Sequence, residues 1–146
     1  MTPLFTCIYS LPQTQDFALK VYHYLLNENI KIVYLKGDVG TGKTTFIKTL
    51  LAAIDPTITV TSPTYTYVNE YQLIDRCIWH FDLYRIESKN ELEDLGLIDY
   101  LTREDGIAFV EWPEKLTEFQ LNQYKKTILQ FFHIENKEER ACVIYS

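Results

Sequence analysis

Hydrophobic residues in this chain follow two patterns, one helical and one typical of buried strands. In residues 14–28 and 46–54, apolar side chains recur three and four positions apart, a spacing that covers one side of a helix. Ile32–Leu35 and Ile107–Val110 are instead uninterrupted apolar runs, as expected for strands that are buried on both faces. Because helical and buried-strand segments alternate, we predict a three-layer α/β fold with a mixed, centrally parallel β-sheet.

The remaining segments are shorter and complete the expected sheet. Phe5–Tyr9 is rich in β-prone residues, and residues 58–85 combine Thr, Tyr, Val and Ile with turn residues, so we expect strands in both. Residues 127–134 and 141–145 read as a closing hairpin. The capping-box sequence Ser88-Lys-Asn-Glu91 predicts the start of a short helix.

The length and composition favour one cytoplasmic domain. A chain of 146 residues has the usual size of a single domain, and we expect residues 1–146 to form one. No apolar run approaches the ~20 residues that a membrane span needs, and the first residues lack the features of a secretory signal. The three cysteines, Cys7, Cys77 and Cys142, are far apart and odd in number, which favours free thiols over a zinc site or disulfides.

The negative charge is concentrated in one part of the chain. The formal net charge is −6, and residues 87–118 contain ten acidic and three basic residues. Such a block is either a solvated helical face or a docking surface for a basic partner. Because non-specific binding to nucleic acid depends on Lys and Arg neutralising phosphates, we do not expect the chain to bind DNA, or to hold RNA by itself.

The strongest chemical signal is the segment Gly37-Asp-Val-Gly-Thr-Gly-Lys-Thr44, which matches the P-loop pattern and lies between an expected strand and an expected helix. Gly40 and Gly42 allow the backbone N–H groups to face one concavity. Lys43 supplies a positive charge for the β- and γ-phosphates, and the Thr44 hydroxyl is a suitable ligand for Mg²⁺. The sequence therefore predicts a P-loop NTPase-like domain that binds a nucleoside triphosphate with Mg²⁺.

Two acidic residues are candidates for the position opposite the P-loop. Glu111 directly follows the apolar run Ile107–Val110, and Asp82 ends a less regular apolar segment. Either could hold the Mg²⁺ shell or orient the attacking water. The alternative for each is a strand-end carboxylate that faces solvent or pairs with an arginine. We expect the neighbouring His80 to be a packing residue and Trp112 to cap the core.

Several further segments, taken with the P-loop, resemble the TsaE (YjeE) family of bacterial ATPases in tRNA threonylcarbamoyladenosine (t6A) biosynthesis. These segments occur in the same order and spacing, and the resemblance extends from about Ile32 to Lys115. They are Ser62-Pro-Thr-Tyr-Thr-Tyr-Val-Asn-Glu-Tyr71, His80-Phe-Asp-Leu-Tyr-Arg85, Glu91-Leu-Glu-Asp-Leu-Gly96 and Val110-Glu-Trp-Pro-Glu114.

The resemblance implies an ATPase that is weak alone and works in a complex with the proteins TsaB and TsaD. In this family, those partners transfer threonylcarbamoyl to an adenosine of the tRNA, and ATP hydrolysis resets the complex between turnovers. The chain would then meet tRNA only through its partners. Its acidic net charge agrees with that arrangement.

The resemblance also implies roles for individual residues. The phosphates would be held by six successive residues: Gly40, Thr41, Gly42, Lys43, Thr44 and Thr45. Thr44 and Glu111 would hold Mg²⁺, and Asp82 would lie near the metal or the attacking water. Thr64, in Ser62–Thr64, would belong to a switch loop that senses the γ-phosphate. Weaker nucleotide contacts are expected from three polar residues: Gln13, Thr14 and Arg140.

Two other functions are compatible with a P-loop. A small-molecule kinase needs an Arg-rich lid over the phosphates, and the region after Asp82 contains Arg85 and Arg103 but is dominated by acidic residues. An ATP-gated assembly factor that does not hydrolyse ATP would use the same switch loop. Turnover in the presence of partner proteins distinguishes that factor from an enzyme.

Overall fold

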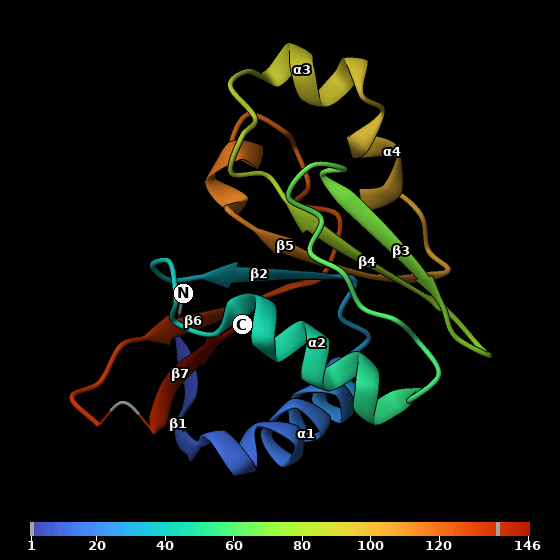
Figure 1. Cartoon of the computed structure of the whole chain (residues 1–146). Coiled ribbons are helices and arrows are strands. Elements are labelled where there is room, and N and C mark those ends of the chain that lie inside the picture. Colours follow the sequence, from blue (N-terminus) through green and yellow to red (C-terminus); the bar gives the residue numbers. More distant parts are fainter. Residues whose placement is uncertain (1, 137) are drawn as a thin grey trace.

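The computed structural model describes residues 2–136 and 138–146, and their strands form one seven-stranded sheet (Figure 1). The strand order is β1-β7-β6-β2-β5-β4-β3. The four strands β6, β2, β5 and β4 are parallel to one another, whereas β1, β7 and β3 pair antiparallel with their neighbours. The predicted mixed, centrally parallel sheet is therefore confirmed. The strands are β1 (Pro3–Ser10), β2 (Ile32–Lys36), β3 (Val68–Gln72), β4 (Cys77–Asp82), β5 (Gly106–Glu111), β6 (Lys126–Phe132) and β7 (Glu139–Tyr145).

Helices cover the sheet on both sides and complete the three layers. Two long helices, α1 (Thr14–Asn27) and α2 (Lys43–Ile54), lie side by side on one face (Figure 1). The short elements α3 (Lys89–Asp94), α4 (Leu97–Leu101) and η2 (Pro113–Leu116) pack over β4 and β5 on the other face; η1 (Leu11–Gln13) precedes α1. Within the described ranges, none of the helices is long and apolar enough to cross a membrane.

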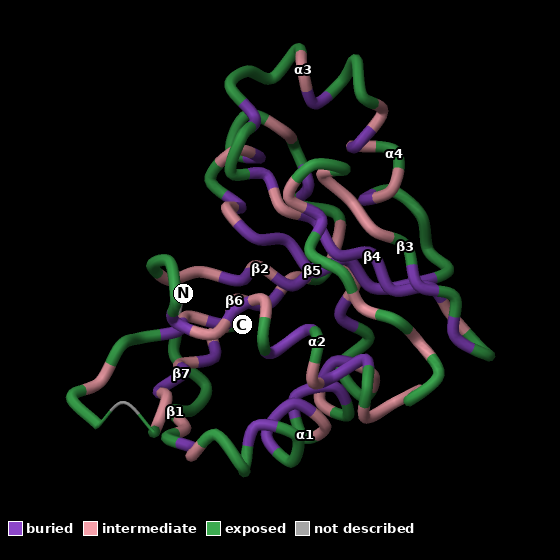
Figure 2. Tube along the Cα trace, viewed as in Figure 1, coloured by how far each residue is buried: buried purple, intermediate pink, exposed green. Residues whose placement is uncertain are grey.

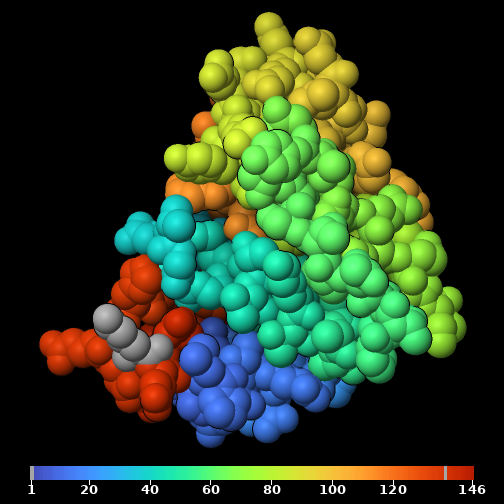
Figure 3. All heavy atoms as spheres, in the orientation of Figure 1, coloured from blue at the N-terminus to red at the C-terminus, as the bar shows by residue number. Residues whose placement is uncertain are grey.

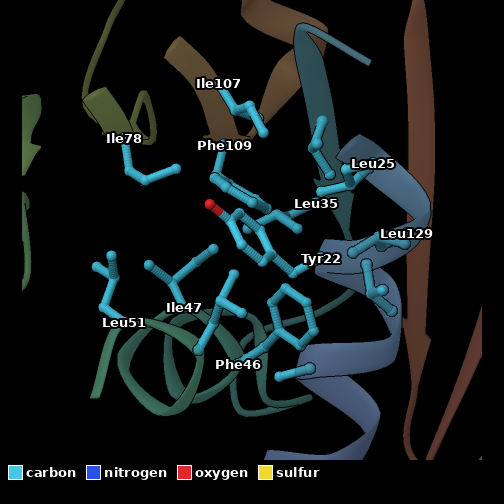
Figure 4. Packing of buried hydrophobic residues seen from close by; sticks show 14 of the residues in the cluster. Tyr22, Leu25, Leu35, Phe46, Ile47, Leu51, Ile78, Ile107, Phe109 and Leu129 are labelled. Carbon is cyan, nitrogen blue, oxygen red and sulfur yellow. The ribbon is translucent and has the colours of Figure 1, made fainter. Parts of the chain in front are cut away.

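The larger core lies between the sheet and the two long helices, where Figure 4 shows side chains from both layers meeting. Phe46 of α2 is completely buried there, with its ring 5.7–6.4 Å from those of Phe17, Phe109 and Phe131. Aromatic pairs at these distances add to the stabilisation from apolar burial. In Figure 2, the buried residues follow the central strands and the inner sides of α1 and α2, whereas α3 is mostly exposed. The core therefore fixes the start of α2 against the ends of the central strands.

The prediction that residues 58–85 consist of strands separated by turns is only partly correct. Residues 68–72 and 77–82 form strands, but residues 58–67 do not. Ile58 and Val60 pack against the core, and the carbonyl of Thr61 accepts hydrogen bonds from Asn69 Nδ2 (3.0 Å) and the Tyr71 hydroxyl (3.2 Å). Side chains therefore satisfy the Thr61 carbonyl without a neighbouring strand.

Two local expectations are confirmed. Ser88 precedes α3, and its Oγ accepts a hydrogen bond from the Glu91 backbone N–H (3.2 Å). In a complete capping box, the Glu91 carboxylate would accept a hydrogen bond from the Ser88 backbone N–H. Here it accepts from the backbone N–H of Glu87 instead (2.9 Å). Cys7, Cys77 and Cys142 are free thiols, as the sequence predicts.

The parallel strands end level with one another, and this alignment places the candidate site. Leu35 of β2 and Asp82 of β4 are both register partners of Glu111, the last residue of β5. The P-loop leaves β2 at this edge and leads into α2. In open α/β sheets, ligands bind outside the carboxyl ends of the strands. The P-loop, Asp82 at the end of β4 and Glu111 at the end of β5 all lie at this edge.

Candidate functional site

A cavity of about 330 Å³ lies at the carboxyl edge of the sheet. The P-loop and the start of α2 contribute Val39, Gly40, Gly42, Lys43, Thr44 and Thr45. The strand ends and the loop before β3 contribute Ser62, Thr64, Asp82, Tyr84, Glu111 and Trp112. The third wall consists of Tyr9, Leu11, Thr14 and Arg140. Figure 3 shows the P-loop region in cyan at the surface, between the red C-terminal strands and the green segment that leads to β3.

Two glycines give the P-loop its shape. Gly37 has φ +140°, and a Cβ there would lie 2.7 Å from both the Phe131 carbonyl oxygen and Thr41 Oγ1, closer than van der Waals contact allows. Gly42, at φ +105°, is the N-cap of α2, and among the described residues no side chain caps this helix end. The N–H groups of the first turn therefore face the cavity, where an anion would be favoured.

Lys43 lies beneath the loop and is almost completely buried. Its ammonium group donates hydrogen bonds to the carbonyl oxygens of Gly37 (2.5 Å) and Asp38 (2.9 Å), and it lies 5.2 Å from the centre of the Trp112 ring. An ammonium has three donors, so these bonds leave one N–H for a ligand. The loop thus positions a positive charge at the base of the cavity.

Glu111 is held by two side chains from different elements. Its Oε1 accepts hydrogen bonds from the Thr44 hydroxyl (2.8 Å) and from His80 Nε2 (2.8 Å). The residue is only 4% exposed, although it forms part of the cavity wall. Thr44 and Glu111, which the sequence placed at one metal site, are therefore in direct contact.

Asp82 is less constrained than Glu111. One carboxylate oxygen accepts from the backbone N–H of Tyr84 (3.1 Å), and the other accepts a long hydrogen bond from the Thr64 hydroxyl (3.5 Å). The Thr64 hydroxyl also lies 2.8 Å from Ser62 Oγ. The structure thus links the predicted switch loop to the candidate acid on β4.

The donor set at this edge fits Mg²⁺. Thr44, Asp82 and Glu111 all present oxygen atoms to one cavity, and Mg²⁺ is usually bound through one or two carboxylates together with waters and phosphate oxygens. Within residues 2–136 and 138–146, no three His, Cys, Asp or Glu side chains form a metal site by themselves. The residues present therefore suit a cation that arrives with a phosphate ligand.

The far wall brings together residues that are distant in sequence. The cavity is lined here by Thr14 at the start of α1, by Arg140 on β7 and by Tyr9 on β1. Burial raises the pKa of the Tyr9 hydroxyl above its usual value. Two other candidates do not line it. Thr41 is buried, with its hydroxyl donating to the Asp38 carbonyl (2.7 Å), and Gln13 accepts from the backbone N–H of Ser10 (2.9 Å).

The sequence analysis missed two features of the site. His80 does more than pack, because it donates a hydrogen bond to Glu111. Trp112 lines the cavity in a left-handed conformation with φ +59°, and its ring lies 5.0 Å from that of Tyr84. The alternation of side chains along a strand puts His80 and Asp82 on one face, which was the available signal for the first. For the second, the signal was the position of Trp112 directly after Glu111.

Comparisons with known proteins agree with this geometry. A family model described as "Threonylcarbamoyl adenosine biosynthesis protein TsaE" matches residues 8–142. The tRNA threonylcarbamoyladenosine biosynthesis protein TsaE of Haemophilus influenzae is 46% identical over 91 residues, which are 62% of this chain and 57% of that protein. The TsaE protein of Bacillus subtilis is 41% identical over 122 residues, or 76% and 75% of the two chains.

A solved structure supports the fold independently. The crystal structure of YdiB from Bacillus subtilis superposes with a TM-score of 0.64 and 20% sequence identity, and the match covers 99% of this chain and 86% of YdiB. The matches to the TsaE proteins of Haemophilus influenzae and Borreliella burgdorferi span less than two thirds of those proteins, 57% and 61%. The match of the family model to nearly the whole chain shows that this protein belongs to the TsaE family.

Proposed function

We propose that this chain binds and hydrolyses ATP with Mg²⁺ at the P-loop cavity, and that it does so together with TsaB and TsaD in the t6A modification of tRNA. The observation that carries this proposal is the convergence of Lys43, Thr44, Asp82 and Glu111 on one cavity beside the open start of α2. Membership of the TsaE family indicates that the chain acts in t6A biosynthesis. The activity and the partners are proposed by analogy with that family.

Phosphate binding relies on the backbone of Gly40–Thr45 and on the ammonium of Lys43. The N–H groups at the start of α2 and the positive end of its dipole favour the phosphate oxygens. Lys43 adds a charge-assisted hydrogen bond to the β- or γ-phosphate, while its bonds to Gly37 and Asp38 keep the ammonium in place. Thr14 and Arg140 line the far wall of the cavity, and we expect them to contact the rest of the nucleotide.

Two carboxylates, those of Glu111 and Asp82, have different roles in the proposed hydrolysis. Thr44 and Glu111 would hold Mg²⁺, which when bound withdraws charge from the phosphates. The Thr44 hydroxyl can offer a lone pair to the cation while its O–H still donates a hydrogen bond to Glu111 Oε1. Asp82, which is nearer to solvent, is placed to contact the metal shell or to orient the attacking water.

Nucleotide sensing is assigned to Ser62–Tyr71. Thr64 bonds to Asp82 only at 3.5 Å, and in its 2.8 Å contact with Ser62 Oγ it can accept the hydrogen bond. A γ-phosphate can therefore compete for the proton of the Thr64 hydroxyl at little cost. Loss of that phosphate on hydrolysis would return Thr64 to Asp82. This exchange gives the loop two states that a partner protein can distinguish.

Partner binding accounts for the acidic character of the chain. With a net charge of −6, the protein is unsuited to neutralise tRNA phosphates, so we propose that it meets tRNA only through TsaB and TsaD. The excess of acidic residues in 87–118 lies on and around α3, α4 and η2, away from α1 and α2 (Figure 1). We propose a cytoplasmic location, where tRNA modification takes place.

The alternative functions differ in measurable ways. A kinase lid is disfavoured because the guanidinium of Arg85 stacks on the Tyr65 ring (4.6 Å) and Arg85 is not among the cavity-lining residues described. A non-hydrolysing assembly factor would bind ATP and its partners without phosphate release.

The test is ATP hydrolysis measured for the chain alone and with purified TsaB and TsaD. We expect slow phosphate release alone, clear stimulation by the two partners together, and loss of both in Lys43→Ala. Lys48→Ala removes an exposed lysine from the same helix and should behave like the parent. Binding of ATP and partners without any stimulated phosphate release would instead establish the assembly-factor function.

A further inference from the structure

A buried histidine contacts the candidate metal-site acid. His80 on β4 is 0% exposed, and its Nε2 lies 2.8 Å from Glu111 Oε1. In the Mg²⁺-binding state, where a carboxylate ligand carries no proton, the imidazole is the donor of this hydrogen bond through Nε2. The same Oε1 atom also accepts from the Thr44 hydroxyl at 2.8 Å. One carboxylate oxygen is therefore fixed by β4 and α2 together.

Packing alone does not explain a histidine at this position. Ile78, two residues earlier on the same face of β4, fills the core between the sheet and the helices. His80 instead leaves its Nδ1 buried with no hydrogen-bond partner among the described residues. Such an atom loses its hydration without compensation, a cost that an apolar side chain would avoid. The polar atom that the His80 side chain contacts is Glu111 Oε1.

We propose that His80 is a positioning residue that orients the Glu111 carboxylate for the Mg²⁺ of a bound nucleotide, an inference that rests on the proposed function. Both hydrogen bonds to this carboxylate end on Oε1. This arrangement leaves Oε2 as the oxygen that can turn to the cation or to its water shell. Without His80, the hydrogen bond from Thr44 would be the one left to this carboxylate within the described part of the chain, and Thr44 must also ligate the metal.

The proposal separates two contributions to nucleotide affinity. Contacts of the phosphates with Lys43 and with the start of α2 do not involve His80, so nucleotide binding without a metal should be independent of it. The gain in affinity on adding Mg²⁺ depends on the orientation of Glu111. Removing a group that orients a metal ligand typically lowers metal affinity by about 10–100-fold, and the loss should appear in this gain.

Three substitutions of His80 distinguish positioning from packing. In His80→Gln, the side-chain amide nitrogen can occupy the place of Nε2 and still donate to Glu111. His80→Asn has the same amide, but its shorter side chain places the nitrogen near the position of Nδ1, out of reach. His80→Leu keeps the bulk and removes the donor. Ile78→Val is the matched control, because it loosens the same face of β4 without touching Glu111.

The experiment is calorimetric titration of each full-length variant with a non-hydrolysable ATP analogue, once in EDTA and once in Mg²⁺. We expect His80→Leu and His80→Asn to match the parent in EDTA and to lose about 10-fold or more of the Mg²⁺-dependent gain. His80→Gln and Ile78→Val should retain most of that gain. If His80→Leu is unfolded, the comparison of His80→Asn with His80→Gln decides.

Other outcomes would overturn the inference. A full Mg²⁺-dependent gain in His80→Asn, or an equal loss in His80→Gln and His80→Asn, would show that the hydrogen bond to Glu111 does not matter. An equal loss in Ile78→Val would assign the effect to packing of β4. If the parent binds no nucleotide in either buffer, the proposed function fails and this inference fails with it. If the parent binds normally but the His80 variants show no selective loss, only the role proposed for His80 is refuted.

Discussion

Substitution of Lys43 by alanine should weaken ATP binding strongly while leaving the fold intact. In the structure, the Lys43 ammonium uses two of its three donors on the carbonyl oxygens of Gly37 and Asp38, so one N–H is left for a phosphate oxygen. A hydrogen bond to a charged group contributes about 1.5–3 kcal/mol. Losing one such bond therefore predicts an increase in Kd of about 10- to 150-fold.

Isothermal titration calorimetry with ATP and Mg²⁺ measures this change, and thermal unfolding of the same samples checks the fold. Lys48→Ala is the control, because Lys48 is an exposed lysine on the same helix and does not line the cavity. Its Kd should equal that of the parent. A Kd for Lys43→Ala within the error of the parent's, in a sample that unfolds normally, would refute the phosphate-binding role of the P-loop.

Three further predictions concern the acid, the switch loop and a buried thiol. Glu111→Ala should lower partner-stimulated hydrolysis by about 10²-fold or more, whereas Glu28→Ala, which removes an exposed acid outside residues 87–118, should not; equal rates would make Glu111 a purely structural residue. ATP and ADP should differ in their effect on affinity for TsaB–TsaD by about 5- to 150-fold, and Thr64→Ala should reduce that difference; identical Kd values in both nucleotides would exclude the switch. Burial raises the pKa of the Cys142 thiol to about 12 from 9.0, so the unfolded chain loses this proton first and stability falls as pH rises above about 9. Between pH 8 and 10.5 this linkage amounts to about 2 kcal/mol, and denaturant unfolding of Cys142→Ala should show a smaller alkaline loss than the parent.

The P-loop and the central strands were predictable because each has a local physical cause. A strand buried on both faces must be apolar throughout, and both Ile32–Leu35 and Ile107–Val110 have this pattern. The glycines of the P-loop mark positions where a Cβ would clash or where φ is positive, as the structure shows at Gly37 and Gly42. An acid directly after such a strand lies at the carboxyl edge, and Glu111 lines the cavity there.

The parts that sequence reasoning missed depend on contacts between distant segments. His80 meets Glu111 because β4 lies next to β5 in register, and the order of strands in the sheet is not encoded in either strand alone. Residues 58–67 have strand-like composition but form no strand, and within them the Thr61 carbonyl accepts hydrogen bonds from the side chains of Asn69 and Tyr71. Propensity is a weak guide where tertiary contacts satisfy the backbone in this way.

The central claim is that this chain sustains t6A modification by hydrolysing ATP at the P-loop cavity. The most direct measurement is the amount of t6A formed on tRNA by TsaB and TsaD, supplied with threonylcarbamoyl-adenylate and ATP, with the parent chain, with Lys43→Ala, or with neither. With the parent chain, we expect the amount of t6A to exceed the amount of the TsaB–TsaD complex. In the other two reactions, t6A formation should stop near the amount of the complex. Equal product in all three reactions would contradict it.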